Sequence, residues 1–147
     1  VIIEGVDNLL VRLSHCCAPV PGDKIVGYIT KGRGVSVHRL DCPNVAHAEA
    51  NGERIVEVYW DNPSETTTMY NADLEIQGYN RDGLLNDVLR IVNGTTKQLN
   101  VVNGRVDHNK MVTISISLGI RNAEQLERLM DNLKNVQDVY VVKRPFR

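Results

Sequence analysis

Three cysteines and one histidine in the first half of the chain carry its most suggestive chemistry. Cys16 and Cys17 are adjacent, and His38 is followed four positions later by Cys42. Thiolates and imidazole are the ligands that Zn²⁺ prefers in a closed tetrahedral site. Neighbouring side chains of a strand point to opposite faces, so both thiols can reach one metal only from a turn. Pro19 follows closely and is compatible with such a turn.

Two other interpretations of these residues stay open. One thiol can be a small buried apolar side chain, with the other partly exposed and His38 on a strand face. Cys16 or Cys17 with His38 also has the residue types of Cys–His catalysis, but we find no supporting catalytic motif. We therefore expect no catalysis here, and a zinc site or a metal-free cluster are the alternatives.

Basic residues accompany the thiols. Between Arg12 and Arg39 the only acidic residue is Asp23, although the whole chain has 17 Lys and Arg against 18 Asp and Glu. A local basic patch can contact the phosphates of RNA, whereas a solvated basic face explains the same residues without a partner. The candidates for RNA contact are Arg12, Lys31, Arg33 and Arg39.

A polar stretch divides the chain. Residues 61–69 contain Pro63 and three threonines, between segments that both show strand patterns. We expect a first domain at residues 1–63, a second at 64–147, and a linker near 61–69. Because about 60 residues can bury little core, the first domain should need a metal, a partner or its neighbour for stability.

The first domain is predicted to be a small mixed, β-rich fold. Short β-rich runs separated by Gly and Pro turns predict strands at 9–13, 25–30, 35–39 and 55–60, and a short helix at 43–50. The glycines at 32 and 34 favour a hairpin turn at 31–34, with two cations at its tip.

The second domain has a clearer order of elements. Alternating apolar residues predict a strand at 72–77, and helical spacing predicts a helix at 84–92 that stops near 93–94. Two strands at 99–106 and 111–120 follow, then a helix after the N-cap Asn122 and a last strand at 136–142. The order β-α-β-β-α-β is the ferredoxin-like arrangement, with both helices on one face of the sheet. The predicted fold class is therefore α+β.

The open face of this sheet argues against base stacking. RNA-recognition motifs stack bases on aromatic side chains of their central strands. If Ala72, Leu74 and Ile76 face the helices, no aromatic side chain lies on the opposite face. That face carries Asp73, Glu75, Gln77, Thr113, Ser115 and Ser117. The turn at residues 80–83 is a better binding candidate, because N–H groups at a helix N-terminus can hold a carboxylate. An ordinary capped turn is the alternative.

The first half resembles the C-terminal regulatory region of the long RelA/SpoT homologues, the bacterial enzymes that make and degrade (p)ppGpp. The resemblance lies in residues 12–23, 25–39 and 41–44, which include the Cys-Cys and His-x₃-Cys positions. In that family this segment is the zinc-finger or RIS domain, and an ACT domain follows it. The resemblance implies that Cys16, Cys17, His38 and Cys42 form the family's cluster. It also implies that the basic run faces RNA of the ribosome with a deacylated tRNA in the A site.

The second half resembles amino-acid-binding ACT domains. Its motif is Asn80-Arg81-Asp82-Gly83-Leu84-Leu85, like the turn that holds a ligand at an ACT dimer interface. Asn100 matches a position that reaches the ligand from the partner subunit. The resemblance implies Val or Leu as the ligand and a homodimer. Asp82 stands where ACT domains of metabolic enzymes frequently have Pro.

The sequence thus predicts a non-catalytic regulatory module of a (p)ppGpp synthetase/hydrolase in the stringent response. It would relay ribosome and tRNA status, and amino-acid binding, to the catalytic domains of the same chain. The alternative is an amino-acid-sensing ACT tail of a metabolic enzyme, which has no use for the Cys-Cys and His-x₃-Cys cluster. A free-standing zinc-dependent RNA-binding protein would predict a basic second half, but residues 64–147 hold eleven basic and ten acidic residues.

Location follows from composition. The apolar runs are all shorter than a membrane span, the first residues lack the basic start of a signal peptide, and three cysteines are a poor disulfide framework. We expect a cytoplasmic protein with reduced thiols and no membrane segment.

Overall fold

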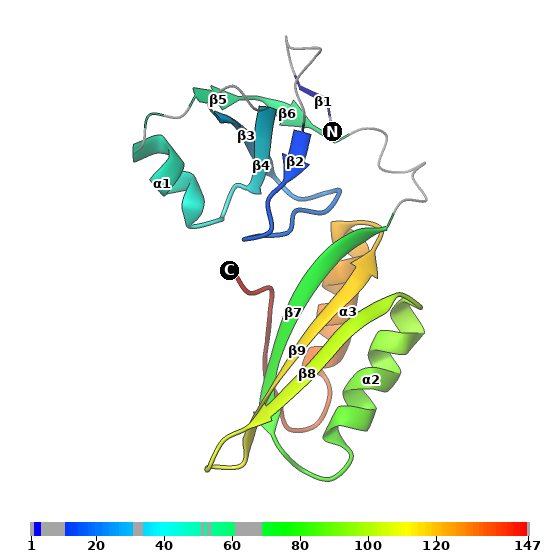
Figure 1. The fold of residues 1–147 in the computed structure, drawn as a ribbon. Helices are drawn as coiled ribbons and strands as arrows, with labels where there is room; N and C mark the ends of the chain where they lie inside the picture. The colour runs from blue at the N-terminus through cyan, green and yellow to red at the C-terminus, as the bar shows by residue number, and fades with distance from the viewer. Residues whose placement is uncertain are drawn as a thin grey trace. The chain divides into compact units, whose positions relative to one another are not determined.

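The computed structural model describes residues 2–3, 11–30, 34–50, 52, 54–60 and 69–146. The chain divides into two compact units, residues 1–66 with 146–147 and residues 67–145. Each unit combines β-sheet with helix, so the α+β class is confirmed (Figure 1).

The first unit is built on a four-stranded sheet with the strand order β2-β4-β3-β5. Its elements are β1 (Ile2–Ile3), β2 (Val11–Leu13), β3 (Ile25–Thr30), β4 (Gly34–Arg39), α1 (Asn44–Ala50), β5 (Arg54–Val56) and β6 (Val58–Tyr59). β2 runs parallel to β4, whereas β3 is antiparallel to both β4 and β5. β1 and β6 form a separate antiparallel pair.

The predicted strand at 55–60 is two strands, and the reason is a change of partner. β5 pairs with β3, but β6 pairs with β1, so the chain leaves one sheet for the other at Glu57. The predicted helix and the strands at 25–30 and 35–39 are confirmed within one residue at each end. The tip of the predicted hairpin turn, residues 31–33, lies outside the described residues, as do residues 9–10 and most of the predicted linker.

The core of the first unit is small and built from valines. Val35, Val37 and Val58 are buried, with five partly buried aliphatic side chains packed around them. Gly27 lies so close to this cluster that an added Cβ would stand 2.8 Å from Val58 Cγ1 and 2.9 Å from Val35 Cγ1. A side chain there would have to displace the core.

The other face of this sheet carries His38. Tyr28, which is opposite Ser36 in the β3–β4 register, is buried, and its hydroxyl donates to the carbonyl of Val45 in α1 at 3.4 Å. The rings of Tyr28 and His38 meet edge to face with centroids 6.0 Å apart. The helix is thereby held on the face that presents the imidazole.

The second unit has the predicted β-α-β-β-α-β order. Its elements are β7 (Tyr70–Tyr79), α2 (Leu84–Thr95), β8 (Leu99–Val106), β9 (Met111–Ile120), α3 (Ala123–Lys134) and β10 (Val139–Lys143). The strands are antiparallel in the order β10-β7-β9-β8, and both helices lie on one side of the sheet (Figure 1). The ferredoxin-like prediction is confirmed.

Strict alternation along β7 and β9 separates the two faces of this sheet. Ala72, Leu74 and Ile76 are almost fully buried, as are their neighbours on β9, Ile114, Ile116 and Leu118. On the opposite face the hydroxyl of Ser117 donates to Asp73 Oδ1 at 3.0 Å. The predicted division into a helix-facing side and a polar side is confirmed for these strands.

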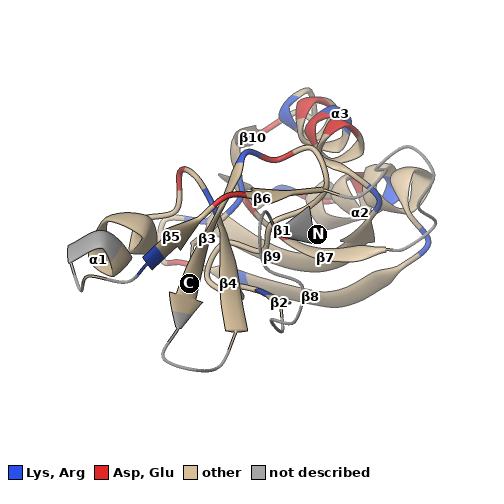
Figure 2. Cartoon of the chain, turned by 90° about the horizontal axis from the view of Figure 1, so that it is seen from above, with Lys and Arg blue, Asp and Glu red and all other residues tan. Residues whose placement is uncertain are grey.

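Helix α3 is amphipathic and capped as predicted. The side chain of Asn122 accepts from the backbone N–H of Gln125 at 2.8 Å, and Leu126, Leu129 and Leu133 face the core. The outer side carries both signs of charge (Figure 2), including the exposed ion pair of Glu124 and Arg128. None of the helices in the described ranges is long and apolar enough to cross a membrane.

Three elements of the second unit have boundaries that differ from prediction. β7 extends two residues beyond the predicted 72–77 at each end, from Tyr70 to Tyr79. α2 continues through Gly94 to Thr95 and ends where Thr96 becomes extended, because one glycine is tolerated inside a helix. The last strand begins at Val139 rather than 136, since the N–H groups of Val136 and Val139 are engaged in turns after α3.

Candidate functional site

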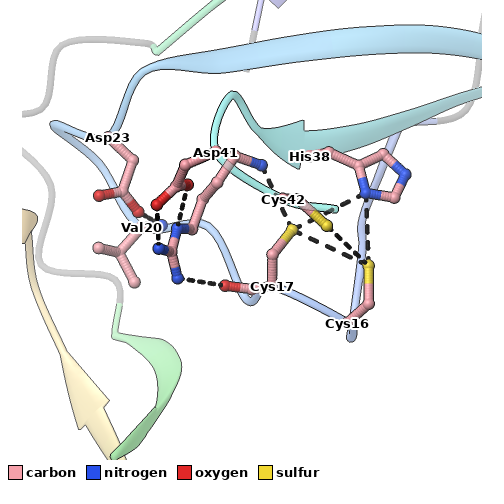
Figure 3. A network of polar contacts seen from close by, with 8 residues as sticks. Cys16, Cys17, Val20, Asp23, His38, Asp41 and Cys42 are labelled. Carbon is pink, nitrogen blue, oxygen red and sulfur yellow. Dashed lines mark hydrogen bonds and ion pairs between the residues drawn. The ribbon is translucent and has the colours of Figure 1, made fainter. Parts of the chain in front are cut away.

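The two adjacent thiols lie on a turn and not in a strand. β2 ends at Leu13, and the N–H of Ala18 donates to the carbonyl of Ser14 at 3.0 Å, which closes a turn around Cys16 and Cys17. Ala18 has the left-handed φ of 45° that this closure requires. Both sulfur atoms therefore point the same way (Figure 3), which removes the geometric objection to a shared metal.

His38 and Cys42 complete the cluster from the end of β4. The N–H of Cys42 donates to the carbonyl of Arg39 at 3.0 Å, so the chain turns back towards His38 directly after the strand. The Nδ1 atom of His38 lies 3.4 Å from Cys16 Sγ and 3.8 Å from Cys17 Sγ. Cys16 Sγ is 3.6 Å from Cys42 Sγ and 4.0 Å from Cys17 Sγ.

These separations fit a tetrahedral metal site. The four donor atoms all lie within 4.8 Å of one another. Zn–S bonds of about 2.3 Å at tetrahedral angles place two sulfur atoms about 3.8 Å apart, and a Zn–N bond brings nitrogen slightly closer. The donor set of three thiols and one imidazole is that of a structural zinc site with no open position. The cluster thus fits zinc in donor type and in spacing.

Two of the three thiols, those of Cys17 and Cys42, are buried enough to resist ionisation without a metal. Burial raises the pKa of Cys17 to about 12, although the N–H of Arg39, 3.3 Å from its sulfur, opposes the rise. Burial also raises the pKa of Cys42. A neutral thiol is a poor nucleophile, which disfavours Cys–His catalysis by Cys17. A bound cation would instead displace the thiol protons.

The side chain of Arg39 lies between Asp41 and the thiol turn and contacts both. Its side chain is only 9% exposed and forms a paired contact with Asp41, Nη2 to Oδ2 at 2.6 Å and Nε to Oδ1 at 3.0 Å. Its Nη1 donates to the carbonyl of Cys17 at 3.3 Å. The guanidinium therefore holds the thiol turn and is largely shielded from solvent, which disfavours contact with RNA phosphates.

The other RNA-contact candidates differ from Arg39 in their surroundings. Arg12 on β2 is exposed, whereas Lys31 and Arg33 lie outside the described residues. Charge alone could not separate Arg39 from these residues. The short spacing to Asp41 was the available signal for its ion pair.

In the second unit the candidate binding turn joins β7 to α2. Gly83 is the N-cap with a φ of 83°, and the described residues provide no side-chain cap for α2. Asn80 and Asp82 are exposed, Leu84 is buried, and Leu85 is 45% exposed. The N–H groups of Asn80, Arg81 and Leu84 donate to carbonyls within the chain. The turn therefore presents mainly its polar side chains and one accessible leucine.

Arg81 anchors this turn to the segment before β10. Its Nη2 lies 2.8 Å from Asp87 Oδ2, and its Nε lies 3.2 Å from Asp138 Oδ2. The hydrogen bond from Arg81 lowers the pKa of Asp87. Nε and Nη2 also donate to the carbonyl of Gln137, 56 positions away in the sequence. Sequence reasoning missed Gln137 and Asp138 because they lie near the other end of the domain's sequence.

Asn100 does not meet the turn within one chain. Its side chain donates to Asn71 Oδ1 at 3.3 Å, near the start of β7, whereas Asn80 follows the last residue of that strand. The 10 residues of β7 span roughly 30 Å at the usual rise of a strand. Asn100 and Asn80 therefore lie near opposite ends of the sheet within the described part of one chain.

Two family models match the chain. Residues 1–61 match the RelA/SpoT RIS domain, and residues 66–144 match the ACT domain. The two matches cover the thiol cluster and the turn at 80–83 respectively.

Relatives match over almost the whole chain. A GTP pyrophosphokinase of Haemophilus influenzae is 37% identical over 98% of this chain and 19% of its own length. Those of Escherichia coli and Streptomyces coelicolor are 36% and 34% identical over the same share of this chain, which is 19% and 17% of their lengths. The chain thus spans under a fifth of these relatives. A crystal structure of the ACT domain of a Chlorobium tepidum GTP pyrophosphokinase aligns with 52% of this chain and 99% of its own, at 23% identity and a TM-score of 0.48.

Proposed function

We propose that this chain, which belongs to the RelA/SpoT RIS and ACT domain families, is the regulatory module of a (p)ppGpp synthetase/hydrolase. The observation that carries the proposal is the pair of regulatory-domain matches along one chain, with GTP pyrophosphokinases as relatives over 98% of it. In the stringent response the module relays signals to catalytic domains of the same protein in the cytoplasm. The family that the sequence resembled is confirmed.

The alternative of a metabolic-enzyme tail has less support. An ACT domain alone is compatible with it, but residues 1–61 match the RelA/SpoT RIS domain. The thiol cluster, whose donors lie within 4.8 Å of one another, also lacks a role in that alternative.

Within the first unit, the cluster of Cys16, Cys17, His38 and Cys42 holds zinc in this proposal. The fit of donor type and spacing supports it. Zinc there supplies a structural cross-link with no open coordination position. The chain's own residues do the rest, since the turn of Cys16 and Cys17 is joined to the end of β4 and braced by Arg39.

The first unit contacts rRNA or A-site tRNA through basic residues outside the cluster. The exposed position of Arg12 supports this part of the proposal. In the full-length protein, Arg12→Glu with Arg33→Glu should weaken association with ribosomes that carry a deacylated tRNA. The salt dependence of binding should also become shallower, because fewer phosphates are neutralised.

The matched control is Arg128→Glu on the exposed side of α3 in the second unit. It reverses the charge of one arginine in the same way and should leave ribosome association unchanged. Equal binding by the double variant and the parent would contradict the RNA-contact role of Arg12 and Arg33.

The turn at residues 80–83 binds Val or Leu in this proposal. Backbone N–H groups at the start of α2 would hold the carboxylate, since the guanidinium of Arg81 is engaged by Asp87 and Asp138. Asn80 would contact the polar end of the ligand, and Leu85 would offer apolar surface to its side chain.

A homodimer would complete this site. β8 is an edge strand whose residues beyond Leu99 are all exposed, including Val101 and Val106 at 55% and 51%. An exposed apolar edge favours pairing with another strand. A second copy would then bring its Asn100 towards the turn of the first.

Calorimetric titration tests the amino-acid site. Valine or leucine should give a heat signal and lysine none. The signal should disappear in Asn80→Ala but persist in Asn93→Ala, which removes an exposed asparagine at the other end of α2. Sedimentation with and without valine tests the dimer. No signal from the parent chain would make the ACT domain purely structural.

A further inference from the structure

We propose that Ser14 is a positioning residue of the zinc site, which holds the imidazole of His38 with Nδ1 directed at the thiols. This inference rests on the proposed zinc site and adds a residue outside the four ligands. The hydroxyl oxygen of Ser14 lies 3.1 Å from His38 Nε2.

The strand register places these two residues together. β2 and β4 are parallel, with Val11 opposite Val35 and Leu13 opposite Val37. The next position in this register sets Ser14 opposite His38, and the N–H of Ser14 donates to the carbonyl of Val37 at 3.0 Å. Because the two side chains share a register position, they lie on the same face. The contact is therefore built into the sheet.

The hydrogen bond suits the protonation state that a metal needs. A neutral imidazole carries one proton, on Nδ1 or on Nε2. When the lone pair of Nδ1 binds a cation, the proton is on Nε2, and the hydroxyl of Ser14 accepts it. In the opposite tautomer Nδ1 would carry the proton and direct an N–H at Cys16 Sγ, 3.4 Å away. Nδ1 would then have no lone pair for the metal. Partners of this kind orient ligating histidines and strengthen metal binding.

The serine also offers a selective substitution. The backbone of Ser14 accepts the N–H of Ala18 in the thiol turn and donates to Val37 in β4. Ser14→Ala removes only the hydroxyl and keeps both backbone bonds. Since the side chain is only partly buried, the variant should fold. Ser14→Thr restores a hydroxyl at the same carbon.

The test uses zinc alone with the 147-residue chain, in competition with a chromophoric chelator. We expect Ser14→Ala to bind zinc roughly 10- to 100-fold more weakly than the parent, with Ser14→Thr close to the parent. Ser115→Ala, the same change at an exposed position of β9, is the matched control and should bind like the parent. Nitrogen-15 NMR of His38 supplies a second measurement. The zinc-loaded parent should show Nδ1 bound to metal and the proton on Nε2.

The outcomes separate the two claims. Zinc binding by the parent with equal affinity in Ser14→Ala would overturn the role of Ser14 and leave the zinc site standing. NMR evidence that Nε2 is the metal-bound atom would do the same. No zinc binding by the parent would overturn both claims. Weaker binding in Ser14→Ala, rescued by Ser14→Thr, would establish the positioning role.

Discussion

The two units of the chain relate their cores to their candidate sites in opposite ways. In the first unit the buried cluster of three valines is small, and two of the three thiols are among its most buried side chains. In the second unit a sheet and two helices share a large core, and the candidate turn lies outside it. The comparison teaches that folding and site formation coincide in one domain and are separate in the other.

The largest expected effect is the removal of zinc. If the cluster supplies the missing core of the first unit, chelation should destabilise that unit by several kcal/mol, because metal binding there contributes directly to folding. Hydrogen exchange should show lost protection in β3 and β4 and unchanged protection in β7 and β9. Equal protection in both units after chelation would contradict the idea that only the first unit depends on the metal site for folding.

A core substitution in the second unit should give the reciprocal result. Leu129 is fully buried in α3, so Leu129→Ala should lower the free energy of unfolding of this unit by about 2–5 kcal/mol. Zinc content should stay at the parent value, as measured by metal analysis of the purified variant. A coupled loss of zinc would show that the units depend on each other.

Alkaline pH should affect the metal-free first unit. The pKa of Cys17 is about 12 in the folded state against an ordinary 9.0, because burial disfavours the thiolate. The unfolded chain thus releases this proton first, and stability falls as pH rises from 9.0 towards about 12. Denaturant unfolding of the chelated protein at several pH values checks this. Cys17→Ala is the control and should flatten the dependence.

The smallest effect concerns the anchor of the turn in the second unit. Arg81→Ala removes two partly exposed ion pairs, so the loss of stability should be smaller than in any of the changes above. The hydrogen bond from Arg81 holds the pKa of Asp87 below its ordinary 3.8, and this contribution is lost as pH falls below that value.

The acid dependence of unfolding should therefore be weaker in Arg81→Ala than in the parent. Glu124→Ala, which removes the exposed ion pair on α3, is the matched control and should leave the acid dependence intact. Identical acid profiles of Arg81→Ala and the parent would contradict the assigned role.

Periodicity made most of the second fold predictable. Alternation in β7 and helical spacing in α3 depend on neighbouring residues, which the sequence displays directly. The contacts of Arg81 with Gln137 and Asp138 were not predictable, since they depend on how the end of the chain returns to the turn.

The candidate metal ligands could be predicted by type but not by geometry. The turn that aligns Cys16 and Cys17 depends on the left-handed backbone of Ala18. Glycine usually occupies such a position, so an alanine gave no signal of it in the sequence. The inward position of Arg39 escaped prediction for a related reason. Net charge does not show which basic side chain is held inside the fold, as Arg39 is by the carboxylate of Asp41 and the carbonyl of Cys17.

The spacing of the cluster along the chain has a consequence for how the first unit folds. Cys16 and His38 are 22 positions apart, and the hairpin of β3 and β4 lies almost entirely between them. A cross-link at this point closes a loop and restricts the unfolded ensemble, much as a disulfide does. The hairpin is local and can form first, bringing His38 back towards the thiols. A zinc cross-link there would lower the entropy gained when the hairpin unfolds, so that a single bound ion would stabilise the whole domain.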